Sequence, residues 1–155
     1  MFKISTKASV NISIVFSVLF FAVIIVGAFI LPGFVTASLK FPTDTMLNTT
    51  RLDKYIIISL GYVVLAVAAV TNIMLLKLLY RVKTELVFTT ESISIIRFIS
   101  WCVVLLGLAF FALGWYFLIS FFVAFACIFL GICIRIVKNV IEKATEIKSE
   151  NDYTI

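Results

Sequence analysis

The chain has 155 residues, of which 63% are hydrophobic, and its mean hydropathy is +1.22. Soluble domains contain about 45 to 50% apolar residues, so this composition excludes an ordinary soluble domain and predicts a single membrane-embedded domain over residues 1–155. The net charge of +5 does not indicate direct nucleic-acid binding, because the basic residues form short clusters between apolar runs.

Residues that carry chemistry are sparse in this chain. It contains no histidine, and its three cysteines, Cys102, Cys127 and Cys133, form no CxxC pair. This pattern lacks the usual spacings of zinc, haem-attachment and dithiol-redox sites. We therefore expect no metal, no cofactor and no catalytic residue, and we interpret each cysteine as a small buried hydrophobe.

The first element follows Lys3 and Lys7 and is an uncharged run over residues 10–31, which is long enough to span a bilayer. It resembles a secretory signal, but its 22 residues exceed the usual apolar core of about 7 to 15 residues. We therefore interpret it as a retained anchor. Residues 32–54 are predicted to form an external loop, because Pro32 and Pro42 oppose a continuous helix.

A second uncharged run, residues 55–76, ends at a basic cluster formed by Lys77, Arg81 and Lys83. Asn72 lies in the last third of this run, and a carboxamide in hydrocarbon seeks a hydrogen-bond partner on a neighbouring helix. We interpret Asn72 as an interhelical polar contact rather than a catalytic or transport group. After the cluster, Thr89 is predicted to cap the next helix, with Phe88 and Ile93 as a hydrophobic staple.

Residues 98–134 contain no charged residue. As one helix, these 37 residues would be about 55 Å long, whereas the hydrocarbon core is about 30 Å thick. The chain is therefore expected to cross twice, over residues 98–115 and 117–136, with a hairpin at Tyr116. Small residues recur four positions apart on the fourth span, which predicts close helix packing, either within the bundle or between copies of a homo-oligomer. These pairs are Ser120 with Ala124 and Cys127 with Gly131.

After Arg135, apolar residues recur at helical spacing with charged residues between them, which predicts an amphipathic continuation of the fourth helix over residues 137–155. Its apolar stripe consists of Val137, Val140, Ile141, Ala144 and Ile147. Three partners would suit the stripe: the bilayer surface, the connection between the second and third spans, or another protein. A solvated continuation of the span is the equally weighted alternative.

Basic residues are distributed unequally between the two sides of a four-span chain. The side of both termini holds ten of them, and the other side holds three, Lys40, Arg51 and Lys54. The positive-inside rule therefore predicts that both termini are cytoplasmic. The expected fold is an all-α membrane protein with four transmembrane helices and a cytoplasmic amphipathic extension of the last helix.

The last residues, KSENDYTI, resemble the carboxyl-terminal signature of small bacterial membrane proteins with domain of unknown function 2975. The connection after the second span and the opening MFKISTKAS are similar to this family as well. The connection matches at Leu79, Tyr80, Arg81, Phe88, Thr89, Ile96 and Arg97. The sequence departs from the family at Glu85 and Leu86, where a turn glycine is expected, and at Ser92, which replaces a frequent asparagine.

The resemblance implies four spans in a bacterial inner membrane, no enzymatic activity, and a neighbouring gene for a small helix-turn-helix regulator. It suggests a contact site for a cytoplasmic protein. The residues of this site would be Arg81, Arg97, Glu150, Asn151 and Asp152. The alternative is a transporter or channel component. We favour the nonenzymatic contact protein, because the uncharged runs 10–31, 55–76 and 98–134 lack the Asp, Glu, Lys, Arg and His residues that proton relays and coupled transport need.

Overall fold

The computed structural model describes the backbone of residues 6–40, 51–84 and 89–152 and the side chains of residues 8–39, 53–84 and 89–147. The helices are α1 (Thr6–Lys40), α2 (Arg51–Lys83), α3 (Thr90–Leu113) and α4 (Leu118–Asp152). Each is long and apolar enough to cross a membrane. The prediction of an all-α chain with four such helices is therefore confirmed. The predicted loop residues 41–50 and Phe88 of the predicted staple lie outside the described residues.

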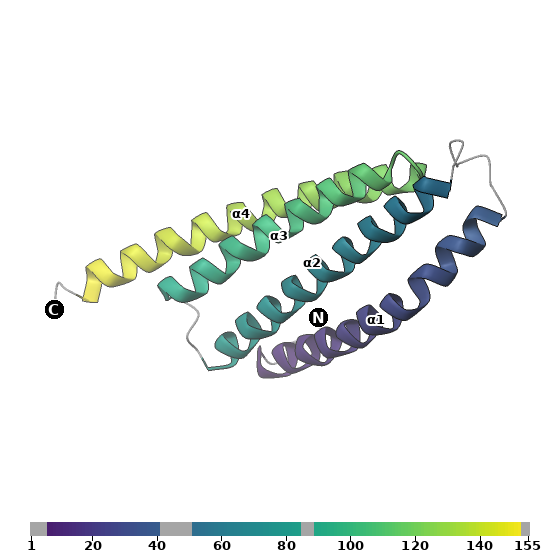
Figure 1. Cartoon of the computed structure of the whole chain (residues 1–155). Helices are drawn as coiled ribbons and strands as arrows, with labels where there is room; N and C mark the ends of the chain where they lie inside the picture. Colours follow the sequence, from purple (N-terminus) through teal and green to yellow (C-terminus); the bar gives the residue numbers. More distant parts are fainter. Residues whose placement is uncertain (1–5, 41–50, 85–88, 153–155) are drawn as a thin grey trace, which may run out of the picture.

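The helices follow one another in a row (Figure 1). α1 packs on α2, α2 on α3, and α3 on α4. Among the described residues, no close backbone approach joins α4 to α1 or α2. The result is a four-helix bundle in which α1 and α4 form the two edges and each edge helix packs closely on one neighbour.

α1 extends beyond the predicted end of the first span, so the prediction that an external loop begins at Pro32 is wrong. The helix continues through Pro32 to Lys40, and Figure 1 shows that it bends along its length. Proline removes one backbone donor and commonly kinks a helix, but burial beyond it keeps the chain helical. Val35 is only 3% exposed and belongs to a cluster with Ile57 of α2 and Leu113 of α3.

The cluster around Val35, Ile57 and Leu113 lies where α3 turns into α4. We call this the turn end of the bundle. Residues 114–117 form the turn, in which the backbone N–H of Gly114 donates to the carbonyl of Phe110 (2.9 Å) and that of Tyr116 donates to Leu113 (2.9 Å). The chain reverses within a few residues, so α3 and α4 are antiparallel neighbours.

Small residues allow α3 and α4 to approach closely. A Cβ atom added to Gly107 of α3 would lie 3.1 Å from the carbonyl oxygen of Ala124, and one added to Gly131 of α4 would lie 2.7 Å from Val104. Ala124 is fully buried, and the hydroxyl of Ser100 donates to the carbonyl of Gly131 (2.9 Å). Ala124 and Gly131 of the predicted small-residue stripe therefore pack within the bundle, against α3.

Large apolar side chains cover much of the outer surface. Phe16 and Phe29 on α1 and Phe122 on α4 are among the exposed ones. Exposure of such a surface to water is unfavourable, whereas contact with lipid tails is not, because the tails are as apolar as these side chains. The distribution is that of helices surrounded by hydrocarbon.

Candidate functional site

Charged side chains gather where α2 ends, α3 begins and α4 passes beside them, at residues 77–84, 89–97 and 135–147. We call this the charged end. Arg81 of α2 forms an ion pair with Glu91 in the first turn of α3, and the Nζ atom of Lys77 lies 3.9 Å from the same carboxylate. The Arg81 side chain is mostly buried, and its Nε atom has no hydrogen-bond partner within the described part of the chain. These contacts fix the end of α2 against the start of α3.

Thr89 sets where α3 begins. It is the N-cap residue of α3 in an extended conformation, and the backbone N–H of Ser92 donates to its Oγ1 atom (3.3 Å). Such a cap satisfies one of the backbone donors that a helix start leaves free. The predicted capping role of Thr89 is confirmed.

A second set of charges joins α3 to α4. The Nη2 atom of Arg97 lies 3.2 Å from the Oε1 atom of Glu142, which also forms an ion pair with Lys138 one turn earlier on α4. Nearer the turn end, the guanidinium of Arg135 lies 4.7 Å from the ring centre of Trp101. Exposed ion pairs contribute little to stability, so these contacts follow from the close packing of α3 on α4 rather than determine it.

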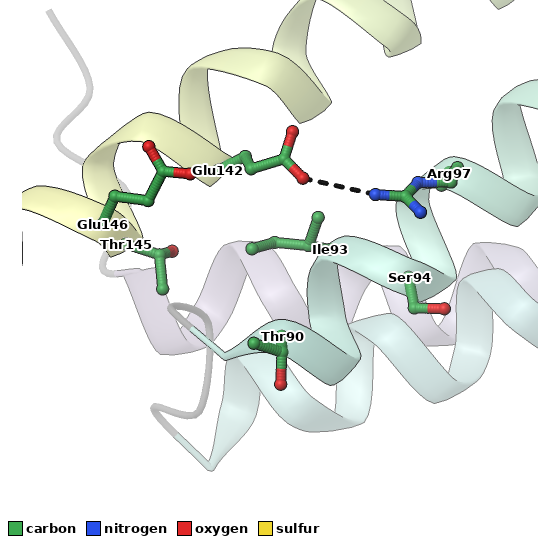
Figure 2. Close-up of a pocket in the computed structure, with 7 residues that line it drawn as sticks. All are labelled: Thr90, Ile93, Ser94, Arg97, Glu142, Thr145 and Glu146. Carbon is green, nitrogen blue, oxygen red and sulfur yellow. Dashed lines mark hydrogen bonds and ion pairs between the residues drawn. The ribbon is translucent and has the colours of Figure 1, made fainter. Parts of the chain in front are cut away.

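A groove with a volume of about 380 Å³ lies beside the Arg97–Glu142 pair. Its lining residues are Thr90, Ile93, Ser94 and Arg97 of α3 with Glu142, Thr145 and Glu146 of α4. Figure 2 shows Arg97 reaching across from α3 to Glu142 on α4. The groove combines a buried apolar side chain, Ile93, with hydroxyl groups and charges of both signs. This chemistry suits a polar segment of a protein with one or two apolar residues.

The structure gives no indication of a metal centre in the described residues. No group of three or more His, Cys, Asp or Glu side chains comes together there in a way that would hold a metal ion. Glu91 and Glu142 instead form ion pairs with basic side chains of a neighbouring helix.

Asn72 lies away from the charged end, between α2 and α1. Its side chain is 3% exposed, the hydroxyl of Ser17 donates to its Oδ1 atom (2.5 Å), and its Nδ2 atom donates to the Ser17 carbonyl (2.9 Å). The two side chains therefore bond across the α1–α2 interface, between apolar surfaces.

The turn end carries its own polar contact. The hydroxyl of Tyr116 donates to the Oδ1 atom of Asp53 at the start of α2 (3.3 Å). Burial and the adjacent Asp53 carboxylate raise the pKa of Tyr116 above its ordinary value. The shift favours the protonated phenol, which donates this hydrogen bond.

The predicted contact residues fall into two groups. Arg81 and Arg97 both lie at the charged end, but in separate ion pairs, with Glu91 and Glu142. The backbone of Glu150, Asn151 and Asp152 continues α4, and their side chains lie outside the described residues. A contact between the arginines and this tail stays a prediction.

Sequence reasoning missed several partners in these sites. Glu91, Glu142 and Ser17 were not identified as contact residues, although the four-residue spacing of Lys138 and Glu142 indicates a pair on one helix face. Nothing in the sequence links Arg97 to Glu142, because they are 45 positions apart. Their contact depends on the antiparallel packing of α3 and α4.

Comparison with known proteins assigns the chain to a family. Residues 35–155 match the family model described as Protein of unknown function (DUF2975). The chain belongs to this family. The resemblance predicted from the tail and the α2–α3 connection is therefore confirmed, and the match begins near the end of α1, so it excludes the opening segment. No curated protein and no solved structure matches the chain.

Membership of DUF2975 and the four apolar helices together define the general class of the protein. This DUF2975 member is a multi-pass integral membrane protein with an all-helical fold. The family description assigns no activity.

Proposed function

We propose that this DUF2975 member is a nonenzymatic protein of the bacterial inner membrane whose charged end faces the cytoplasm and binds a cytoplasmic protein. The orientation follows from the excess of basic residues on the side that carries the charged end, ten against three. The charged end would then offer its ion pairs and its groove to the cytoplasm.

The observation that carries this proposal is the groove beside the Arg97–Glu142 pair. It lies between α3 and α4, which pack closely at Gly107 and Gly131, and α4 continues past the start of α3 as a projecting helix (Figure 1). A preformed groove with a projecting wall lowers the entropy lost when a peptide segment binds. Arg97 is about half exposed and keeps hydrogen-bond donors available for such a segment.

A small helix-turn-helix regulator is the partner class that we favour. The resemblance to the family implies that genes for such regulators tend to neighbour genes of this kind. A regulator held at the membrane would be kept from its DNA, so the proposed consequence of binding is altered transcription. The protein itself needs no contact with nucleic acid for this role.

Affinity capture tests this proposal. The detergent-solubilised protein is expected to capture the regulator encoded beside it, and Arg97→Glu is expected to lower the captured amount roughly tenfold, equivalent to about 1.4 kcal/mol. The reason is that this substitution replaces a positive charge in the groove with a negative one. Lys54→Glu, which makes the same charge change at the turn end, is the matched control and should capture as the wild type does.

Two results would contradict the proposal. One is that affinity capture recovers no regulator and that deletion of the gene for this membrane protein leaves transcription unchanged. The other is equal capture by Arg97→Glu and the wild type, which would remove the groove from the contact. Equal amounts of each variant in the membrane fraction show that the comparison concerns binding rather than insertion.

A further inference from the structure

Trp101 of α3 and Arg135 of α4 stack on each other at the outer surface of the α3–α4 pair. The guanidinium carbon of Arg135 lies 4.7 Å from the ring centre of Trp101, which is within the range of a cation–π interaction. Trp101 is 51% exposed, and Arg135 is exposed as well. A guanidinium that stacks on an aromatic ring keeps the N–H donors at its edge available for another group.

The surroundings of Arg135 carry an excess of positive charge. Within the described residues, no carboxylate forms an ion pair with Arg135, because Glu91 pairs with α2 and Glu142 pairs with Arg97 and Lys138. Glu142 is seven residues further along α4, or about 10 Å along the helix axis. Arg97, Arg135 and Lys138 therefore stand beside a single carboxylate, and Arg135 is the one of these three that it does not pair with.

The depth of Arg135 in the membrane follows from the sequence. Arg97 and Arg135 are the charged residues that border the uncharged run 98–134, and the antiparallel packing of α3 and α4 brings both to the same end of the bundle. Lipid phosphates occupy the polar layer directly outside the hydrocarbon core, and tryptophan is enriched at this boundary. The guanidinium of Arg135 is therefore placed at the level of the lipid phosphates.

An apolar stripe on α3 leads from Trp101 towards the turn end. Trp101, Leu105 and Leu108 are 51%, 52% and 56% exposed, and their spacings of four and three residues place them on one face of the helix. A phospholipid with its phosphate at Arg135 can lay an acyl chain along this stripe. The site thus offers a cation at headgroup depth and an apolar surface below it.

We propose that Trp101 and Arg135 form a binding site for an anionic phospholipid, whose phosphate accepts hydrogen bonds from the Arg135 guanidinium. The planar fork of arginine suits two oxygens of one phosphate. The excess of positive charge favours a headgroup with a net negative charge, such as phosphatidylglycerol, over zwitterionic phosphatidylcholine. Neither Trp101 nor Arg135 lines the groove beside Arg97 and Glu142, so this site is independent of the proposed cytoplasmic partner.

Tryptophan fluorescence tests the site, because Trp101 is part of it. The chain has two tryptophans, and Trp115→Phe leaves Trp101 as the single reporter. This variant is reconstituted in phosphatidylcholine vesicles that contain increasing fractions of a lipid with brominated acyl chains, either phosphatidylglycerol or phosphatidylcholine. Bromine quenches tryptophan at contact. The relative affinity at Trp101 is expected to favour phosphatidylglycerol by about fivefold, the effect of one basic side chain at an anionic surface.

Substitutions in the same background assign the preference to Arg135. Arg135→Gln is expected to remove it, and Arg135→Lys to lower it, because an ammonium group lacks the planar fork of donors. Lys83→Gln is the matched control, since it makes the same charge change at an exposed position of α2 at the same end of the bundle. This control should keep the preference. Arg135 is at the surface, so its variants are expected to fold, and the amount of each in the vesicles confirms it.

Several results would overturn the proposal. Equal quenching of Trp101 by the two brominated lipids would show that no anionic lipid is preferred there. A preference that Arg135→Gln or Arg135→Lys leaves unchanged, or that Lys83→Gln lowers as much as Arg135→Gln, would show a diffuse attraction by net charge. Loss of the preference in inorganic phosphate, but not in sodium chloride of equal ionic strength, would assign the site to the free ion instead of a lipid.

Discussion

At the scale of single residues, two polar contacts in the apolar part of the bundle join neighbouring helices. Asn72 and Ser17 bond across the α1–α2 interface, and Ser100 bonds to the backbone of Gly131 across the α3–α4 interface. In hydrocarbon such groups lack water as a partner, so leaving one unpaired is unfavourable. We interpret Asn72 as a packing contact, since both polar atoms of its carboxamide are already bonded to Ser17.

Substitution of Asn72 tests that interpretation. Asn72→Leu is expected to destabilise the protein by no more than about 2 kcal/mol, because interhelical hydrogen bonds in membranes contribute about 0.6 to 2 kcal/mol. Unfolding in mixed micelles measures the change. Ser13→Ala is the control, since the Ser13 hydroxyl donates only to the Ser9 carbonyl of its own helix, and its effect should be smaller. Loss of partner binding by Asn72→Leu with unchanged stability would instead assign Asn72 to a functional site.

At the scale of helices, the closest packing is that of α3 on α4. Gly107 and Gly131 lie at this interface, and backbone atoms of the facing helix stand near both. Backbone atoms cannot rotate away as a flexible side chain can, so any added atom there must separate the helices. This interface positions Arg97 opposite Glu142 and therefore sets the shape of the groove.

Replacement of Gly107 tests the importance of this approach. Gly107→Ala is expected to destabilise the fold by about 1 to 3 kcal/mol, the usual effect of overpacking, because the new Cβ would lie 3.1 Å from the Ala124 carbonyl and 2.7 Å from Ile128. Gly33→Ala on α1 is the matched control, since nothing lies within 4 Å of its added Cβ. That control should be neutral or slightly stabilising, because alanine favours helices. Equal stability of the two variants in denaturant titrations would show that the α3–α4 interface accommodates an added methyl group at position 107.

The sequence predicted the local features of these helices better than their contacts. The reversal near Tyr116 follows from the length of the uncharged run, and the cap at Thr89 follows from local side-chain chemistry. The predicted end of the first span was wrong. The prediction considered the helix-breaking tendency of Pro32 but could not include the burial of Val35 against α2 and α3. The contact of Arg97 with Glu142 was not predicted, since it depends on the register of α3 against α4.

At the scale of the whole molecule, the two ends of the bundle differ in the number of charged contacts that they hold. Asp53 and Tyr116 bond at the turn end, whereas the charged end holds two sets of ion pairs and the groove. The row of helices leaves α4 at an edge, where α3 is the only described helix that packs closely on it. In the proposed function, the part of α4 that continues past the start of α3 would contact the cytoplasmic partner.

The orientation of the charged end is the central claim, because the proposed partner can reach the groove only from the cytoplasm. Topology reporters test it directly. A reporter fused after Ile155 is expected to be active only as a cytoplasmic reporter, and one inserted at Thr45, between α1 and α2, only as an external reporter. The account predicts this pattern from the ten basic residues on the side of the termini. The opposite pattern, an external carboxyl end with a cytoplasmic Thr45, would contradict it.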